Sequence, residues 1–298
     1  MQPSYKRIHV IVNPASGQDQ PFFHAVNHVF HPAGIDWDIY ITKKGGDARR
    51  LAKEAVKAGA DAVAVYGGDG TVAEVAAGLT GSNTPLAILP GGTTNATARV
   101  LGVPTDLAKA VSLITDPNAA PKSFDMMRVG DGFVFGVVAL GVMGDVAVNT
   151  DRASKDRLGN VAYGISAVKA SWYAHHHKSD YIIRLDGREL RGNGVACLIT
   201  NHGAGFLNLK PPIDASDGLL DVMVFSGKRM RTVSGAAANM VTRNERFTPV
   251  EHWQGKVVEV VSEPAQNIQA DGEALEAGKV NVEVAPNAVR FIVPNSKP

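Results

Sequence analysis

Residues 62–71 read AVAVYGGDGT, an apolar run followed by three glycines in four positions around Asp69. A pattern typical of a helix begins directly after the last glycine, at about Thr71. Glycine leaves the backbone N–H groups of such a loop open to a ligand, and the following helix adds the positive end of its dipole. This order of strand, loop and helix therefore predicts a site for a polyphosphate.

Asp69 is the unexpected member of this loop, because a carboxylate repels phosphate unless a cation lies between them. Its presence indicates a bound magnesium ion or a catalytic group placed directly against the ligand. The alternative is an ordinary turn between a strand and a helix, in which Asp69 is a surface residue. The loop by itself leaves both interpretations open.

Two further loops occupy comparable positions in the sequence. Residues 88–95, ILPGGTTN, repeat the order of strand, glycine loop and helix. Residues 12–17, VNPASG, follow the first apolar run, where Asn13 and Ser16 offer side-chain hydrogen bonds; a capping turn is the alternative interpretation. Open α/β sheets bind ligands at the carboxyl ends of their strands, so the loops are expected to converge on one crevice.

The first third of the chain alternates short apolar runs with helical patterns. Such alternation predicts a parallel sheet, because parallel neighbours need a crossover connection. We therefore expect an α/β domain with an open parallel sheet at residues 1–122. The expected strands are 8–12, 37–42, 62–66 and 86–89, and the expected helices are about 21–31, 47–58, 71–79, 94–101 and 107–114.

The pattern changes after the polar stretch 115–122. The segments that follow are β-rich and are separated by Asp-Gly pairs that begin at residues 131, 186, 217 and 271. Asp-Gly between apolar runs is a strong hairpin signal, because both residues tolerate positive φ. Residues 123–298 are therefore predicted to form a mostly antiparallel β domain, with helices at 160–174 and near 232–242. Packing of the C-terminal tail back onto the first domain stays open as an expectation.

The composition is that of a globular protein with a sizeable core: 298 residues, 45% hydrophobic and 20% charged. A net charge of +1 argues against a nucleic-acid partner and against a polybasic membrane anchor. The single cysteine, Cys197, excludes an internal disulfide and fits a reducing cytoplasm. The start lacks a signal-peptide core, and the longest apolar stretch, 133–148, is too short for a transmembrane segment.

Three motifs together resemble the diacylglycerol kinase catalytic domain family, which includes sphingosine, ceramide and bacterial lipid kinases. They are Asn-Pro-x-Ser-Gly at 13–17, Gly-Gly-Asp-Gly-Thr at 67–71 and Pro-x-Gly-Thr-x-Asn at 90–95. The resemblance is specific in these motifs and weaker over the whole chain. It implies an NAD kinase-like α/β domain followed by a β-sandwich, and an ATP- and Mg-dependent enzyme that phosphorylates a lipid hydroxyl.

The resemblance also assigns roles to matching residues. The first two motifs hold ATP in the family, and Asp69 would serve the magnesium-bound phosphates. The positions nominated in this way as ATP contacts are Asn13, Ser16, Gly17, Thr42, Gly67, Gly68, Asp69, Gly70, Thr71 and Thr93.

The segment Ala270-Asp271-Gly272-Glu273 resembles the family's Asp-Gly-Glu segment, whose glutamate is assigned as the catalytic base. Phosphoryl transfer needs one carboxylate to accept the proton of the attacking hydroxyl, and otherwise depends on positioning and charge neutralisation. Glu273 and Asp69 are thus the candidate catalytic residues. The alternative is a hairpin turn in which Glu273 is a solvated strand residue.

Residues 214–219, DASDGL, resemble a second magnesium site of bacterial family members. The candidate ligands are the side chain of Asp217 and the main-chain oxygens of Asp214 and Leu219, since oxygen ligands suit magnesium. An ordinary Asp-Gly turn is the alternative. Asp125 would join the carboxylate network by the same resemblance.

Two departures from the family pattern bear on the acceptor. Family lipid kinases often have Asn-Asp in the third motif and Asn in the helix after the second, whereas this chain has Ala96 and Ala73 there. A missing carboxylate beside the phosphates should change the acceptor or the metal arrangement. Asn followed by Ala occurs in the sphingosine-kinase-like branch, so diacylglycerol, a sphingoid base, ceramide and related lipids all stay open.

Two other functions also stay open. One is NAD kinase-like phosphorylation of a soluble hydroxyl, although that group's downstream Asn-Glu motif is not found in this chain. The other is a catalytically inactive nucleotide-binding regulator. A lipid kinase would meet its lipid substrate through transient contact with the inner membrane face from the cytoplasm. A homodimer is left open, because the sequence does not tell a covered sheet edge from an exposed one.

The run His175-His176-His177 is expected to be a solvated helix end or linker. Adjacent residues on a helix diverge by about 100°, so three neighbouring histidines cannot all face one metal ion.

Overall fold

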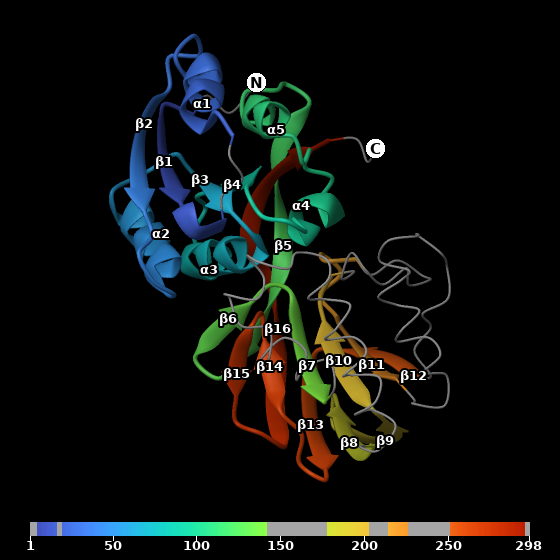
Figure 1. Cartoon of the computed structure of the whole chain (residues 1–298). Helices are drawn as coiled ribbons and strands as arrows, with labels where there is room; N and C mark the ends of the chain where they lie inside the picture. The colour runs from blue at the N-terminus through green and yellow to red at the C-terminus, as the bar shows by residue number, and fades with distance from the viewer. Residues whose placement is uncertain (1–4, 17–19, 142–177, 203–213, 226–250, 296–298) are drawn as a thin grey trace. The chain divides into compact units, whose positions relative to one another are not determined.

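The protein folds into two compact units, which can be followed by label in Figure 1. The computed structural model describes residues 5–16, 20–141, 178–202, 214–225 and 251–295. The first unit is Met1–Met126 together with Pro286–Pro298, and the second is Met127–Ala285. Gly17, the helices expected at 160–174 and 232–242, and the histidine run at 175–177 lie outside the described residues.

The sheet of the first unit has four parallel strands in the order β2-β1-β3-β4. This confirms the predicted open parallel sheet. β3 and β4 are buried along their whole length, which explains their continuous apolar sequence, because helices cover both faces of such a sheet. The strands are β1 (Arg7–Val12), β2 (Asp36–Ile41), β3 (Ala62–Gly67) and β4 (Leu86–Pro90).

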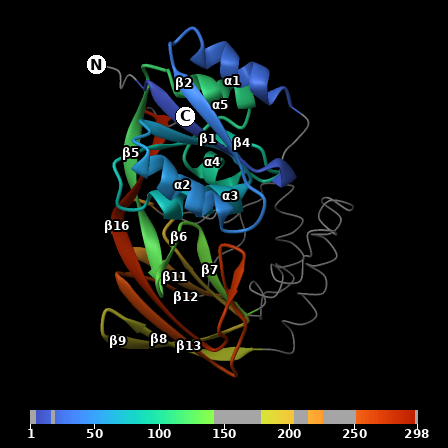
Figure 2. The same cartoon turned by 90° about the vertical axis from the view of Figure 1, so that its left-hand side faces the viewer.

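Helices lie on both faces of this sheet. Figures 1 and 2 show α1 and α5 together on one face and α2 and α3 together on the other. The helices are η1 (Pro14–Ser16), α1 (Phe22–Phe30), α2 (Asp47–Lys57), α3 (Asp69–Leu79), α4 (Ala96–Val100) and α5 (Leu107–Leu113). Among the described residues, no helix is both long and apolar enough to cross a membrane.

Helix α4 begins two residues later than the sequence pattern predicts. Asn95 precedes it with a φ of 48°, in the left-handed region, so the residues before Ala96 cannot continue the helical turn. Asparagine tolerates this conformation better than most residues.

The second unit is the predicted antiparallel β-sandwich. One sheet has the order β12-β11-β10-β7-β14-β15, and the other contains β16-β13-β8-β9, with β5 and β6 attached through β16. The strands that lie wholly or partly in this unit are β5 (Ala119–Val129), β6 (Gly132–Val134), β7 (Val137–Gly141), β8 (Ser179–Leu185), β9 (Arg188–Gly194), β10 (Ala196–Thr200), β11 (Leu220–Phe225), β12 (Glu251–Gly255), β13 (Val257–Glu263), β14 (Ile268–Ala270), β15 (Glu273–Leu275) and β16 (Lys279–Pro294).

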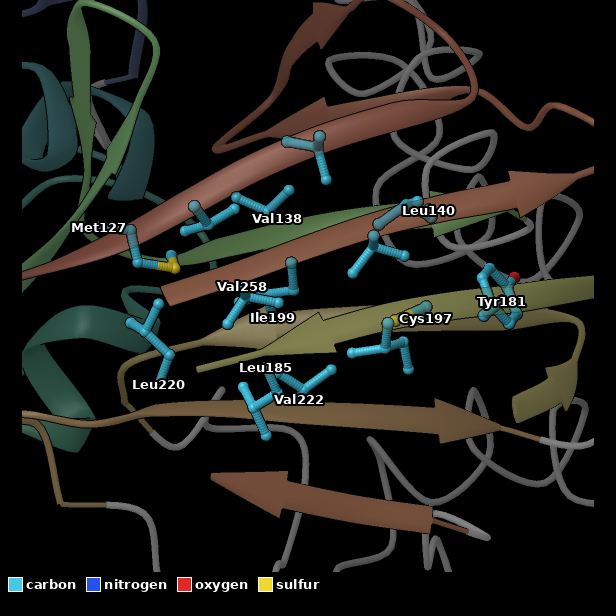
Figure 3. Packing of buried hydrophobic residues seen from close by; sticks show 14 of the residues in the cluster. Met127, Val138, Leu140, Tyr181, Leu185, Cys197, Ile199, Leu220, Val222 and Val258 are labelled. Carbon is cyan, nitrogen blue, oxygen red and sulfur yellow. The ribbon is translucent and has the colours of Figure 1, made fainter. Parts of the chain in front are cut away.

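Alternate residues of the facing strands fill the space between the two sheets. Figure 3 shows Val138 and Leu140 of β7 and Val222 of β11 in one packed cluster with Leu185 of β8 and Val258 of β13. The intervening residues of β7, β10 and β11 form a second buried cluster, as expected when successive side chains point to opposite faces. The strands β7, β10 and β11 therefore bury both of their faces.

Two of the four Asp-Gly pairs mark hairpins in the described part of the chain, and Asp217-Gly218 lies just before β11 with positive φ at Gly218. Asp186-Gly187 joins β8 to β9 and Asp271-Gly272 joins β14 to β15, with positive φ at all four residues. The hairpin between β5 and β6 turns one residue earlier than predicted, at residues 130–131, because Gly130 supplies the positive φ and residue 132 already pairs with Val129. The residues directly before the Asp214 turn lie outside the described part of the chain.

Strand β16 contributes to both units. Its residues from Lys279 to Glu283 pair antiparallel with β13, and Phe291 pairs parallel with Leu86 of β4. Between these two segments, the N–H group of Asn287 donates to the carboxylate of Asp125 at 2.8 Å. The first unit thus includes a strand segment that follows the whole second unit in sequence.

We expect Cys197 to be inert toward thiol reagents while the protein is folded. Its side chain is fully buried, and burial raises the pKa of the thiol to about 12, so the reactive thiolate is scarce near neutral pH. Iodoacetamide should modify the native chain at least about 100-fold more slowly than the urea-unfolded chain, as measured by mass spectrometry. Equal rates would contradict the burial of β10.

Candidate functional site

Three loops meet at the carboxyl ends of β1, β3 and β4. The N–H group of Asn13, after β1, donates to the carbonyl of Tyr66 in β3 at 2.9 Å. The N–H group of Gly91, after β4, donates to the carbonyl of Gly67 at 3.0 Å. The structure thus brings together the three glycine-containing segments that the sequence predicts to converge.

The two glycine loops are in direct backbone contact. A Cβ atom added to Gly92 would lie 2.7 Å from the Cα atom of Gly68, a distance that real Cβ atoms do not reach. A Cβ atom at Gly67 would lie 2.7 Å from that of Thr71, and one at Gly91 would lie 3.0 Å from the ring of Tyr66. Gly67 and Gly92 therefore need glycine for packing, and a side chain at Gly91 would press on the ring of Tyr66.

The backbone of Gly70 faces open space. A Cβ atom there would have no atom of the described chain within 4 Å. Gly70 lies in the first turn of α3, where N–H groups have no partner within the helix. This helix start therefore offers donors and the positive end of a dipole to an anion.

Asn13 ties the first loop to the start of α3. Its side-chain amide donates to the hydroxyl of Thr71 at 2.8 Å, and its side-chain oxygen accepts from the N–H group of Ala15 at 3.1 Å. The hydroxyl of Ser16 donates to the carbonyl of Asn13 at 3.0 Å. Asn13, Ser16 and Thr71, which the sequence nominates as ATP contacts, thus lie in one hydrogen-bonded group.

Asp69 connects the second loop to the third. Its carboxylate accepts hydrogen bonds from the N–H groups of Ala96 at 3.1 Å and Thr97 at 2.9 Å, one on each oxygen. Asp69 therefore caps α4 from a different segment, a role that the sequence did not predict. Each carboxylate oxygen has a second lone pair, so the donor set still fits a magnesium ion.

Asn95 was not nominated from the sequence, although it fixes the third loop. Its side-chain amide donates to the carbonyl of Gly92 at 2.8 Å, and its side-chain oxygen accepts from the N–H group of Gly92 at 3.0 Å. The residue is buried and has positive φ. The preference of asparagine for such turns is the signal that could have identified it.

Thr42 lies at the end of β2, where its N–H group donates to the carbonyl of Val12 at 2.9 Å. The following loop is held by Asp47, whose carboxylate accepts from the N–H groups of Lys43 and Lys44. The hydrogen bond from Lys43 is the main reason why the pKa of Asp47 is lowered. These hydrogen bonds fix the loop that follows β2 next to the end of β1.

Thr93 and Gly17 complete the nominated set. Thr93 is exposed between Gly92 and the start of α4, so its hydroxyl is accessible. Gly17 lies outside the described residues, and its predicted contact with ATP stays a prediction.

Glu273 lies in the second unit, as the first residue of β15. It pairs with Ala270 across the Asp271-Gly272 turn, and its side chain is exposed. The hairpin predicted as the alternative is therefore present. A turn and a catalytic role are compatible, because an exposed carboxylate next to a rigid turn can reach a substrate.

The turn at 214–219 is rich in oxygen atoms. Asp214 accepts hydrogen bonds from the backbone and hydroxyl of Ser216 at 3.0 and 2.7 Å, and Asp217 accepts from the N–H group of Leu219 at 2.9 Å. Both aspartates are exposed. Exposed carboxylates beside main-chain oxygens suit a hard cation such as magnesium.

Asp125 is buried in the first unit and accepts the N–H group of Asn287. This contact gives it a structural role at the return of β16. Its predicted participation in a carboxylate network stays a prediction.

Both parts of the chain match family models. Residues 7–129 match the model described as "Diacylglycerol kinase catalytic domain", and residues 136–293 match the "YegS C-terminal NAD kinase beta sandwich-like domain".

Curated proteins and solved structures agree with these matches. The chain is 30% identical over 266 residues to a Pseudomonas putida protein described as "Probable lipid kinase YegS-like", covering 88% of this chain and 86% of that protein. It is 28% identical over 277 residues to a diacylglycerol kinase of Bacillus subtilis, covering 90% of each. A crystal structure of a diacylglycerol kinase from Bacillus anthracis aligns with a TM-score of 0.76 and 26% identity, covering 97% of both chains.

We expect Asp69→Asn to loosen α4. Asparagine keeps one acceptor oxygen but turns an N–H donor toward an N–H group, so one of the two charge-assisted hydrogen bonds is lost. Hydrogen exchange of the peptide spanning residues 93–100 should become at least about tenfold faster. The matched control is Asp106→Asn, because Asp106 caps α5 through a single N–H group, that of Lys109, which asparagine can also accept. Unchanged exchange at 93–100 in Asp69→Asn would contradict the capping role.

Proposed function

Because the chain belongs to the lipid kinase family that joins a diacylglycerol kinase catalytic domain to a YegS C-terminal sandwich domain, we propose that it transfers the γ-phosphoryl group of ATP to a lipid hydroxyl. The observation that carries this proposal is the packing of three loops around the first turn of α3. Such an arrangement favours the binding of phosphate groups by backbone N–H donors.

The phosphates would lie against the second loop, at the start of α3. Gly70 faces open space there, Gly67 and Gly68 lead the backbone into the turn, and the side chains of Asn13 and Thr71 are hydrogen-bonded to each other at the same place. The remaining contacts would come from Ser16, Gly17, Thr42 and Thr93. Fixed donors are effective here because they need no reorganisation when charge develops on the phosphate.

Magnesium is the cation that such a reaction requires. When bound, it supplies positive charge that offsets the charge of the phosphates. Asp69 would serve the magnesium ion bound to the phosphates. A second magnesium ion would be held in the second unit by Asp217 with the main-chain oxygens of Asp214 and Leu219.

Glu273 would act as the base. Its carboxylate takes the proton of the acceptor hydroxyl as that oxygen forms a bond to the γ-phosphorus. The bond between the γ-phosphorus and the bridging oxygen to the β-phosphate breaks, and ADP leaves with the electron pair. The products are the phosphorylated lipid and ADP.

The acceptor would be a lipid with a free hydroxyl, met by transient contact with the inner face of the membrane from the cytoplasm. Ala96 carries a methyl group where many family members have a carboxylate, and its N–H group is engaged by Asp69. This favours an acceptor other than diacylglycerol, such as a sphingoid base or a ceramide.

We expect phosphate transfer from labelled ATP to at least one of diacylglycerol, sphingoid base, ceramide and phosphatidylglycerol when these are supplied in mixed micelles with magnesium. Chelation of magnesium should abolish the transfer. Transfer to NAD in detergent-free buffer would instead indicate a soluble acceptor. Binding of ATP by calorimetry without transfer to any acceptor would indicate an inactive regulator.

We expect Glu273→Gln to lower kcat by about 10²–10⁴-fold, because the amide cannot accept the hydroxyl proton. The affinity for ATP, measured by calorimetry, should not change. The matched control is Glu276→Gln, which alters an exposed glutamate close by in the sequence and should leave kcat unchanged. Full turnover in Glu273→Gln would remove Glu273 from the role of base.

A further inference from the structure

The carboxylate of Asp271 is held by three consecutive backbone amides, two in the connection between β6 and β7 and one at the first residue of β7. It accepts hydrogen bonds from the N–H groups of Phe135 at 2.9 Å, Gly136 at 3.0 and 3.1 Å, and Val137 at 2.9 Å. The backbone N–H group of Asp271 donates in turn to the carbonyl of Val137 at 3.1 Å. The β14–β15 turn is therefore fixed to residues 135–137 through both the side chain and the backbone of Asp271.

The neighbouring segment approaches this carboxylate closely at Gly136. A Cβ atom at Gly136 would lie 2.4 Å from an oxygen of Asp271. Gly136 is thus required by the contact itself. The contact joins residues that are 134 to 136 positions apart in the sequence, so no local turn propensity produces it.

The turn that is held in this way leads directly into Glu273. Asp271 and Gly272 have φ values of 45° and 96°, and Glu273 pairs with Ala270. Asp271 tolerates positive φ less well than glycine, and the surrounding hydrogen bonds offset that cost. The backbone of the turn sets the position and direction of the Cα–Cβ bond of Glu273, and therefore the region that its exposed carboxylate can reach.

We propose that Asp271 is the positioning residue of the catalytic base. It holds the turn so that Glu273 meets the acceptor hydroxyl in one fixed orientation, and it does not touch the reacting atoms. This inference rests on the proposed function, in which Glu273 takes the proton. Precise placement matters because catalytic rates fall steeply when a reacting group is displaced by about 1 Å.

The chain contains a second aspartate in the same arrangement, at a turn that does not lead into Glu273. Asp186 has a φ of 48° and precedes Gly187 in the β8–β9 hairpin. Its carboxylate accepts from the N–H groups of Lys256 at 3.0 and 3.1 Å and Val257 at 2.9 Å. Asp186 therefore provides a matched control for the purely structural effect of such a contact.

The test compares Asp271→Asn with Asp186→Asn in the full chain. Asparagine has the same shape and tolerates positive φ, but its NH₂ group faces N–H donors, so both variants lose charge-assisted hydrogen bonds. Both should lower the melting temperature by a similar amount. Only Asp271→Asn should lower kcat, by at least about tenfold, with the KM for ATP unchanged. Equal kcat in the two variants would overturn the proposal.

A second variant covers the case in which Asp271→Asn does not fold. Gly136→Ala presses on the same carboxylate from the β6–β7 connection and should give the same loss of kcat at unchanged KM for ATP. A wild-type kcat in folded Gly136→Ala would overturn the proposal as well.

The variant Glu273→Gln separates this inference from the proposed function. If Glu273→Gln is inactive while Asp271→Asn has wild-type kcat, the positioning role fails and the base stands. If Glu273→Gln keeps full turnover, the assignment of the base fails first, and the positioning role fails with it.

Discussion

The contact between the Gly68 and Gly92 backbones is the constraint on which the candidate phosphate site depends. Neighbouring parallel strands lie about 4.8 Å apart, so the loops that leave β3 and β4 must pass each other at close range. Only a residue without Cβ fits at Gly92, where an added atom would lie 2.7 Å from Gly68. Asp69 then bridges the same two loops through the N–H groups of Ala96 and Thr97. The starts of α3 and α4 are thereby held in one arrangement.

The sequence predicted the secondary structure of the first unit closely. The strands β3 and β4 are apolar runs ended by glycine loops, and such runs are identifiable because both of their faces are buried. The late start of α4 was missed, because it depends on the positive φ of Asn95. The Asp-Gly pairs predicted the antiparallel sandwich. The β5–β6 turn lies one residue earlier than its Asp-Gly pair predicts, because Gly130 takes the positive φ there.

The site was predicted less completely than the fold. Local motifs identified Asn13, Thr71 and the glycines, which the structure brings together. The partners of Asp69 were not predictable, because they lie 27 and 28 residues away and depend on the conformation of a second loop. The partners of Asp271 were not predictable either, because the sequence motif indicates only a turn and the partners lie 134 to 136 residues away. The carboxylates of Asp69, Asp186 and Asp271 all accept hydrogen bonds from backbone N–H groups of distant segments. Such contacts have no signature in the local sequence.

The course of β16 has a consequence for how the chain acquires its structure. Residues 286–295 carry buried side chains of the first unit, among them Val289 and Phe291, yet they follow all of the second unit in sequence. During synthesis, the first unit therefore cannot close its core when its own first 126 residues have emerged. It must wait until every residue of the sandwich has been made. A chain interrupted within the sandwich is thus left with a first unit whose core lacks the side chains of Val289 and Phe291.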